Sequence, residues 1–339
     1  MLLKLCDAFG VSGADEEVKD IIISEIKDYC DVKVMKDGNI IAYKKGKKTP
    51  SKKFMIYAHT DEVGLIVKDI TREGYLKFDE VGGIDDRILL GKKVYIGDNR
   101  IPGIVGCKPI HMTSKKEREI TVKKSEMLID IGASSKEDAL NYVQYGDYIL
   151  FDSKSFSQND RRIIGKALDN RVGVATLIKL IKSDNYYDFY ASFNSLEEIG
   201  LKGAATATEY VKPDVALILE GTTCSDVYKT KEYLMSTKLG EGVALSIHDR
   251  GSTSSKSFNE YIEKLANDNN IKFQFKRTNM GGNDAGAIQC GGKGVKTAVL
   301  SLPVRYIHSP VSIADYDDYN NCFKLSKLIV DNIGGFYND

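Results

Sequence analysis

Four short apolar runs in this sequence each lead into side chains that can bind a metal ion. The runs lie at 54–58, 190–196, 215–219 and 297–304, and they are followed in turn by His59, by Glu197 and Glu198, by Glu220, and by His308. Uninterrupted runs of this length and β-branched or aromatic content are typical of buried strands in a sheet that helices cover on both faces. Ligands of such sheets bind just beyond the carboxyl ends of the strands, so we expect these side chains to meet at one edge.

The rest of the chain predicts an α/β fold with an inserted domain. Helices and strands alternate from residue 170 onward, which is typical of a mixed, mostly parallel sheet flanked by helices. Between about residues 65 and 160 the pattern changes to short strands separated by glycine turns, with one helical stretch that Ser135 is placed to cap. We therefore expect a catalytic domain made of residues 1–64 and 161–339, with a small β-rich domain inserted at 65–160.

The expected elements follow from hydrophobic periodicity and turn residues. We expect the first helix to begin near Ala14, and Asp37-Gly38 to form the turn of a hairpin. In the second half the expected helices are 170–182, 202–211, 254–268, 284–291 and 315–332, and the expected strands are 188–196, 215–220, 271–275 and 297–304.

Composition argues against several classes of partner. Lys plus Arg and Asp plus Glu each number 48, so no net charge draws the chain to nucleic acid or to an anionic membrane. No apolar stretch approaches the roughly 18 residues of a spanning helix, and Asp7 interrupts the N-terminus before a signal-type hydrophobic region forms. The six cysteines form no CxxC pair, which argues against a zinc knuckle or a disulfide framework. We expect a cytoplasmic protein with ordinary thiols.

The segments around the strand ends supply further candidate ligands. Asp61 lies two residues after His59, and an extended chain points residues at this spacing to the same side. A carboxylate in that position commonly orients a ligand histidine. Asp169 is at the mouth of the helix that starts near residue 170, where it is either a metal ligand or the helix N-cap. Glu220 closes an apolar strand, where it is a ligand, an ion-pair partner or a solvated side chain at the sheet edge.

Other polar residues are candidates for contacts with substrate. Arg305 lies three residues before His308 and is placed to contact an anion or a carbonyl group. The stretch that begins at residue 281 lacks the spacing of a phosphate loop. We therefore interpret Gly281, Gly282 and Asp284 as part of a loop that lines a pocket.

The candidate ligands form a hard set of nitrogen and oxygen donors. Two histidines and three or four carboxylates, without a thiolate, suit zinc, cobalt or manganese. If Asp169 bridges, the other four ligands divide evenly between two ions about 3.5 to 4 Å apart, a spacing that activates a shared water and polarises a carbonyl. The adjacent Glu197 and Glu198 point in different directions at a strand end, so one can bind metal while the other works as a base.

Taken in order, the segments AHTDEVG, KALDNRVG, LEEIGLKGA, LILEGT and RYIHSP resemble those of the TET-type (tetrahedral) aminopeptidases. This family of cytosolic dinuclear metallopeptidases includes glutamyl and deblocking aminopeptidases, and some members carry an endoglucanase label. The similarity runs almost from end to end, including FGVSGADEEV near the start and VGGIDDRILLGKKV in the insert.

The resemblance implies a role for each candidate residue. It implies that His59 and Glu220 bind one ion, that Glu198 and His308 bind the other, and that Asp169 bridges the two. It also implies that Glu197 is the general base and that Asp61 is the orienting acid. Glu220 departs from the family pattern, since relatives typically carry aspartate there. The resemblance also implies two divalent metal ions per subunit, and dimers that assemble into a hollow tetrahedral dodecamer open only to short, unfolded peptides. The inserted domain is our candidate for dimerisation, because its short strands leave a limited core and available edges.

The leading prediction is a metal-dependent aminopeptidase, in which water attacks the first peptide bond of a short peptide while Glu197 takes its proton and passes it to the leaving amine. A deacylase or amidase acting on N-acyl amino acids would use the same metal centre, and dependence on a free α-amine separates the two. A glycoside hydrolase gains nothing from two histidines, and the chain has no tryptophan for a sugar-binding cleft. A metal-binding scaffold without activity is the remaining alternative.

Overall fold

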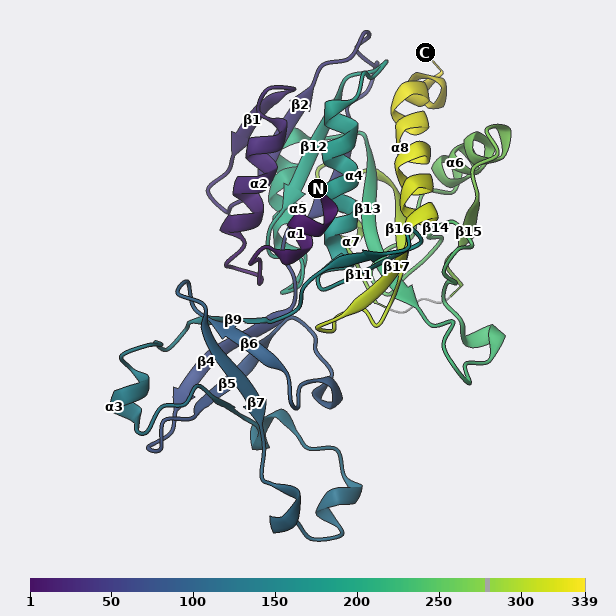
Figure 1. The fold of residues 1–339 in the computed structure, drawn as a ribbon. Coiled ribbons are helices and arrows are strands. Elements are labelled where there is room, and N and C mark those ends of the chain that lie inside the picture. Colours follow the sequence, from purple (N-terminus) through teal and green to yellow (C-terminus); the bar gives the residue numbers. More distant parts are fainter. Residues whose placement is uncertain (278–280, 339) are drawn as a thin grey trace.

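The computed structural model describes residues 1–277 and 281–338. They form an α/β body around an eleven-stranded sheet, together with a closed six-stranded barrel that lies below the body in Figure 1. The expected fold class, a mixed, mostly parallel sheet flanked by helices with an inserted small β-rich domain, is confirmed. In the described part of the chain, no helix has both the length and the apolar character needed to cross a membrane.

The large sheet has its four parallel strands at the centre. Its order is β1-β2-β12-β3-β13-β16-β17-β11-β10, with β14 joined to β16 and β15 to β14. The bounds are β1 Asp31–Val34, β2 Ile40–Lys44, β3 Phe54–His59, β10 Phe156–Gln158, β11 Arg162–Gly165, β12 Phe189–Asn194, β13 Val215–Cys224, β14 Val243–Leu245, β15 Phe273–Phe275, β16 Lys296–Arg305 and β17 Ser312–Asp315. Strands β12, β3, β13 and β16 are parallel neighbours. Every residue of β3 is buried, which explains its uninterrupted apolar sequence.

Helices cover both faces of this sheet. The helices of the body are α1 Leu2–Asp7, α2 Glu16–Ile26, α4 Leu168–Lys182, α5 Lys202–Val211, α6 Lys256–Asp268, α7 Ala285–Ile288 and α8 Tyr316–Tyr337, with a 3-10 turn η5 at Glu232–Leu234. Residues of α1, α2, α4, α6 and α8 share one core with the sheet, and α5 and α7 pack in a smaller core that includes Tyr57 and Ile218. Helix α4 is buried over most of its length against β3 and β13.

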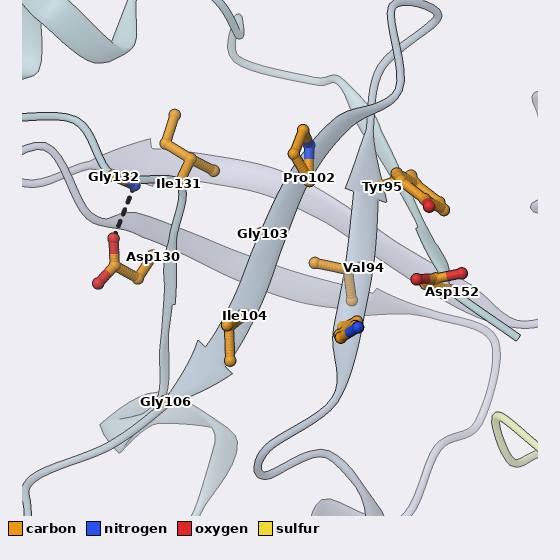
Figure 2. Close-up of a pocket in the computed structure, with 11 residues that line it drawn as sticks. Val94, Tyr95, Pro102, Gly103, Ile104, Gly106, Asp130, Ile131, Gly132 and Asp152 are labelled. Carbon is orange, nitrogen blue, oxygen red and sulfur yellow. Dashed lines mark hydrogen bonds between the residues drawn. The ribbon is translucent and has the colours of Figure 1, made fainter.

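The barrel has its own hydrophobic core. Its strands are β4 Gly64–Ile70, β5 Leu76–Val81, β6 Lys93–Ile96, β7 Ile101–Gly106, β8 Leu128–Asp130 and β9 Tyr148–Phe151, closed in the order β4-β5-β8-β7-β6-β9. Between its strands lie α3 Lys136–Ala139 and the 3-10 turns η1 Asp86–Ile88, η2 Ile110–Met112, η3 Glu117–Glu119 and η4 Lys124–Glu126. Ser135 caps α3 as expected, since its hydroxyl accepts from the backbone N–H of Asp138 at 3.2 Å. A shallow hollow on the barrel beside β6 and β7 is shown in Figure 2.

Several short elements differ from the sequence expectation. Helix α1 and the strands β10, β11 and β17 were not expected, and β10 lies inside the range expected for the insert yet pairs with β11 of the large sheet. The expected helix after Ser135 is limited to α3.

The six cysteines divide by burial. Cys6, Cys224 and Cys322 are buried, Cys30 is half-buried, and Cys107 and Cys290 are exposed. Burial raises the pKa of Cys6, Cys224 and Cys322 to about 12. The buried thiols therefore stay protonated at neutral pH.

Candidate active site

The side chains expected to converge do so at the carboxyl-end edge of the four parallel strands. His59 is the last residue of β3, Glu197 and Glu198 follow β12, Asp169 is the second residue of α4, and His308 lies in the loop between β16 and β17. The prediction that Glu220 ends its strand is wrong. Strand β13 continues past Glu220, because its later residues keep pairing with β16 as far as Cys224.

Asp169 lies between the two histidines. Its Oδ1 is 3.5 Å from His59 Nε2, and its Oδ2 is 3.4 Å from His308 Nε2. His59 Nε2 is also 3.0 Å from Glu220 Oε1, and His308 Nε2 is 3.4 Å from Glu198 Oε2. Three groups have ligand atoms within 4.8 Å of one another: His59-Asp169-Glu220, Asp169-Glu198-His308 and His59-Glu197-Glu198. Asp169 belongs to the first two.

Several atoms of these groups are buried without a hydrogen-bond partner. Within the described residues they include His59 Nε2, Asp169 Oδ1, Glu198 Oε1 and Glu220 Oε2. An unpaired buried polar atom lowers the stability of a fold by roughly 1–3 kcal/mol, so four in one cluster would destabilise the protein considerably if the site bound nothing. A cation that accepts their lone pairs removes this cost.

The pKa values of the cluster reflect burial of many like charges. Burial raises the pKa of Glu198 to about 7 and that of Glu220 to about 8, with the charge of Asp169 adding to both shifts. Burial alone would lower the pKa of His308, but its hydrogen bond with Asp169 and the charge of Glu198 raise it to about 9. These carboxylates therefore need a positive charge beside them to be ionised together at neutral pH.

Glu197 and Asp61 lie next to the cluster. Burial raises the pKa of Glu197 well above its ordinary value, the charge of His59 opposes that shift, and the charge of Glu198 adds to it. The Asp61 carboxylate accepts the backbone N–H groups of Glu197 and Glu198, both at 3.1 Å. His59 Nδ1 is 3.1 Å from the backbone oxygen of Asp61 and 3.5 Å from its Oδ1. Asp61 therefore contacts both the backbone of the glutamate pair and the imidazole of His59.

A cavity of about 500 Å³ opens on the cluster. Gly281 and Gly282, two of the predicted substrate contacts, are in its wall. Arg305 and Asp284 are not among its lining residues. The guanidinium of Arg305 pairs with Asp226 at 2.6 and 2.7 Å. Asp284 is fully buried and accepts from the side-chain amide of Asn194 at 2.7 Å.

The cavity wall also contains residues that were not expected from the sequence. Lys276, Thr222 and Thr223 line it. Burial lowers the pKa of Lys276, against the opposing charges of Asp249 and Glu220. The two threonines lie in the part of β13 beyond Glu220, which explains their position in the wall. Nothing in the sequence around Lys276 indicates that it lines a cavity.

Comparison with known proteins identifies the family. Residues 38–325 match the family model described as M42 glutamyl aminopeptidase. This chain belongs to the M42 aminopeptidase family. Membership agrees with the TET-type resemblance and makes the chain a metal-dependent aminopeptidase, a hydrolase of peptide bonds.

Individual relatives support this assignment over almost the full length of the chain. A lysyl aminopeptidase of Pyrococcus furiosus is 29% identical over 98% of this chain and 96% of its own. The crystal structure of a TET aminopeptidase from Thaumarchaeota archaeon SCGC AB-539-E09 has a TM-score of 0.94 at 34% identity, covering 99% of this chain and 97% of its own. The TET1 peptidase of Pyrococcus horikoshii, described as able to assemble into a tetrahedron or a large octahedral shell, has a TM-score of 0.87 at 32% identity, covering 97% of this chain and 98% of its own.

Proposed function

We propose that this M42 enzyme uses two divalent metal ions to remove N-terminal residues from short peptides. The observation that carries the proposal is the shared position of Asp169, whose two carboxylate oxygens face different histidines. One carboxylate that serves two ligand groups is the arrangement expected of a bridging ligand.

The residues present fit such a pair of ions. His59 and Glu220 would hold one ion, Glu198 and His308 the other, with Asp169 between them. The unpartnered buried atoms of this cluster are the nitrogen and oxygen donors that zinc, cobalt and manganese accept. Ions held there would polarise the scissile carbonyl and lower the pKa of an attacking water.

Glu197 is our general base. Its Oε2 lies 4.0 Å from His59 Nε2. The carboxylate is therefore beside the five proposed ligands but is not one of them. A raised pKa suits a carboxyl that takes a proton from water and then gives it to the leaving nitrogen. Asp61 positions this step, because it fixes the backbone of Glu197 and the ring of His59.

The cavity of about 500 Å³ then receives the N-terminal residue of the substrate. Gly281 and Gly282 let the peptide approach the cavity wall closely, and Lys276, which also lines the cavity, supplies a positive charge. We extend the proposal to the assembly, a homo-oligomer built from dimers into a tetrahedral dodecamer, on the strength of the P. horikoshii relative. The cytoplasmic location expected from the sequence stays a prediction.

The test begins with protein stripped of metal and reloaded with zinc, cobalt or manganese. Each form is assayed on single amino-acid p-nitroanilides and on the same compounds with an acetylated α-amine. We expect hydrolysis only after metal loading and only with the free amine. Equal hydrolysis of the acetylated compounds would indicate a deacylase or amidase instead.

Glu197→Gln separates the proposed base from the ligands. We expect this variant to keep its fold and two metal equivalents while kcat falls by about 10² to 10⁴-fold. Asp169→Asn is the matched comparison, because loss of a bridge should reduce bound metal in elemental analysis. Near-normal turnover in Glu197→Gln would refute the base, and two full equivalents in Asp169→Asn would refute the bridge.

A further inference from the structure

A second cavity lies beside the one that contains the metal cluster. Its volume is about 690 Å³, and two segments form it: residues 83–92 of the connection between β5 and β6, and residues 306–311 of the loop between β16 and β17. Gly83, Ile307 and His308 line both cavities. The two spaces therefore meet at the cluster, with the barrel forming one wall of the second.

His308 is the boundary between the two cavities. Its Nε2 faces Asp169 and Glu198, while its Nδ1–H donates to the backbone oxygen of Gly83 at 2.9 Å. A substrate whose scissile bond lies at the cluster and whose N-terminal residue fills the first cavity reaches the second cavity by continuing past this ring. The space on the other side of the ring is the second cavity.

The charge in the second cavity is positive on balance. Asp85 and Arg87 neutralise each other, since the Arg87 guanidinium donates to both carboxylate oxygens of Asp85, and this pairing lowers the pKa of Asp85 to about 2. Lys92 has no carboxylate within ion-pair distance among residues 1–277 and 281–338. Its ammonium group is thus available to an anion that enters the cavity.

We propose that the second cavity binds the part of the peptide beyond the scissile bond and that Lys92 binds its C-terminal carboxylate. The proposal rests on the aminopeptidase function and adds a preference for short peptides with a free carboxyl terminus. Each extended residue spans about 3.3–3.6 Å, so only peptides with a few residues beyond the scissile bond place their carboxylate inside the cavity. Longer peptides carry it past Lys92 and lose the contact.

The neighbouring Lys93 is a natural control. Successive residues of an extended chain point to opposite sides. Accordingly Lys93 lines the hollow beside β6 and β7 shown in Figure 2, together with Tyr95 and Asp152, and it does not line the second cavity. Lys92 ends the connection and Lys93 begins β6, and both are exposed, so neutralising either removes one positive charge at adjacent positions.

The test compares one tripeptide as the free acid and as the C-terminal amide, with the metal-loaded full chain. The quantity measured is the ratio of kcat/KM for the acid to kcat/KM for the amide. We expect the ratio to be about five in the wild type, mainly through KM, as is typical of one exposed charge pair. It should fall to about one in Lys92→Gln, invert in Lys92→Glu, persist in Lys92→Arg, and stay at the wild-type value in Lys93→Gln. Salt should lower the wild-type ratio.

The outcomes separate this inference from the proposed function. A wild-type enzyme that cleaves acid and amide equally, or a Lys92→Gln variant that keeps the wild-type ratio, would overturn the carboxylate contact alone. An equal fall of the ratio in Lys93→Gln would also overturn it, because the effect would then be one of general charge. Wild-type protein that releases no N-terminal residue from either form would contradict the peptidase proposal itself.

Discussion

Glu220 is the ligand candidate that departs from the TET-type resemblance, which implies aspartate, one methylene shorter, at this position. It reaches within 3.0 Å of His59 Nε2 from inside β13, so the strand fixes its backbone. We predict that Glu220→Ala binds one metal equivalent fewer, because His59 and Asp169 alone leave that ion without its third protein ligand. Elemental analysis measures this directly.

Glu220→Asp is the matched control. It keeps the carboxylate, and we expect it to keep both ions while shifting the relative activity among zinc, cobalt and manganese. Unchanged metal content and activity in Glu220→Ala would show that Glu220 is not a metal ligand.

Asp284 is a buried carboxyl whose ionisation should weaken the fold. Burial raises its pKa from 3.8 to about 6. The native protein therefore holds this proton more tightly than the unfolded chain, and the associated stability is complete below about pH 4 and lost as the pH rises through 6. We predict that Asp284→Asn, which retains an oxygen to accept from Asn194, raises the melting temperature of the metal-free protein at pH 8 by a few degrees. The difference should vanish near pH 4.

Asp226→Asn provides a contrast of opposite sign. Burial raises the Asp226 pKa, but its hydrogen bond with Arg305 lowers it on balance. The stability gained from this carboxylate is present above its unfolded pKa and lost as the pH falls. We expect Asp226→Asn to lower the melting temperature at pH 8. A stabilising effect of Asp226→Asn, or a destabilising effect of Asp284→Asn at that pH, would contradict the assignment.

At the scale of elements, the start of α5 holds the segment that carries Glu197 and Glu198. Asn39 donates to the backbone oxygen of Gly203 at 2.7 Å and accepts from the backbone N–H of Ser195 at 2.9 Å. A Cβ atom on Gly203 would clash with the backbone oxygen of Ser195 and lie 2.5 Å from Asn39 Oδ1. The helix and the glutamate segment are therefore in direct contact, with no room for a methyl group.

We predict that Gly203→Ala lowers the free energy of unfolding by about 1–3 kcal/mol, as overpacking typically does, and also lowers kcat/KM because the glutamates move. Denaturant unfolding and peptide assays measure the two effects. Gly106→Ala is the control, since a Cβ there meets no atom within 4 Å. A Gly203→Ala variant as stable and active as Gly106→Ala would show that this contact is not constraining.

The sequence predicts best those elements whose pattern lies within their own residues. Strands β3, β12 and β16 are long, apolar and buried, so both their existence and their convergence follow from the pattern. Strands β10, β11 and β17 are three or four residues long and are defined by pairing with distant segments, which no local pattern shows. The end of β13 was misplaced for a related reason, because its pairing with β16 outlasts the apolar run.

The same distinction applies within the site. Four of the five ligand candidates lie at or shortly after the end of a strand or near the start of a helix, and the fifth, Glu220, lies within β13. The sequence predicts all five together. The pairing of Arg305 with Asp226 joins residues far apart in sequence, so no local pattern predicts it. The wall position of Lys276 likewise depends on the folded arrangement.

At the scale of the whole molecule, the segment between β7 and β8 extends from the barrel as an arm with exposed apolar side chains. Ile110, Met112 and Ile120 are 70%, 61% and 67% exposed. Apolar side chains gathered on a protruding segment are typical of a surface that another copy covers. The arm is thus our candidate contact between subunits.

We predict that light scattering of the purified chain gives a particle about twelve times its 37.6 kDa mass. Ile120→Asp should shift it to a smaller species, because a charge placed in an apolar contact loses its hydration. Lys115→Glu, which changes the charge on the same exposed arm without removing apolar surface, should leave the particle intact. A strict monomer in the wild type would contradict self-association, and a stable dimer would contradict the closed shell.

The uneven burial of the cysteines makes the protein ready for site-specific labelling. Cys107 lies on the barrel and Cys290 follows α7 in the α/β body, and both are exposed. The thiols at Cys6, Cys224 and Cys322 are buried and protonated, so they react slowly with maleimides. A donor and an acceptor dye on the two exposed thiols would report, by energy transfer, whether the distance between the barrel and the α/β body changes when a peptide binds.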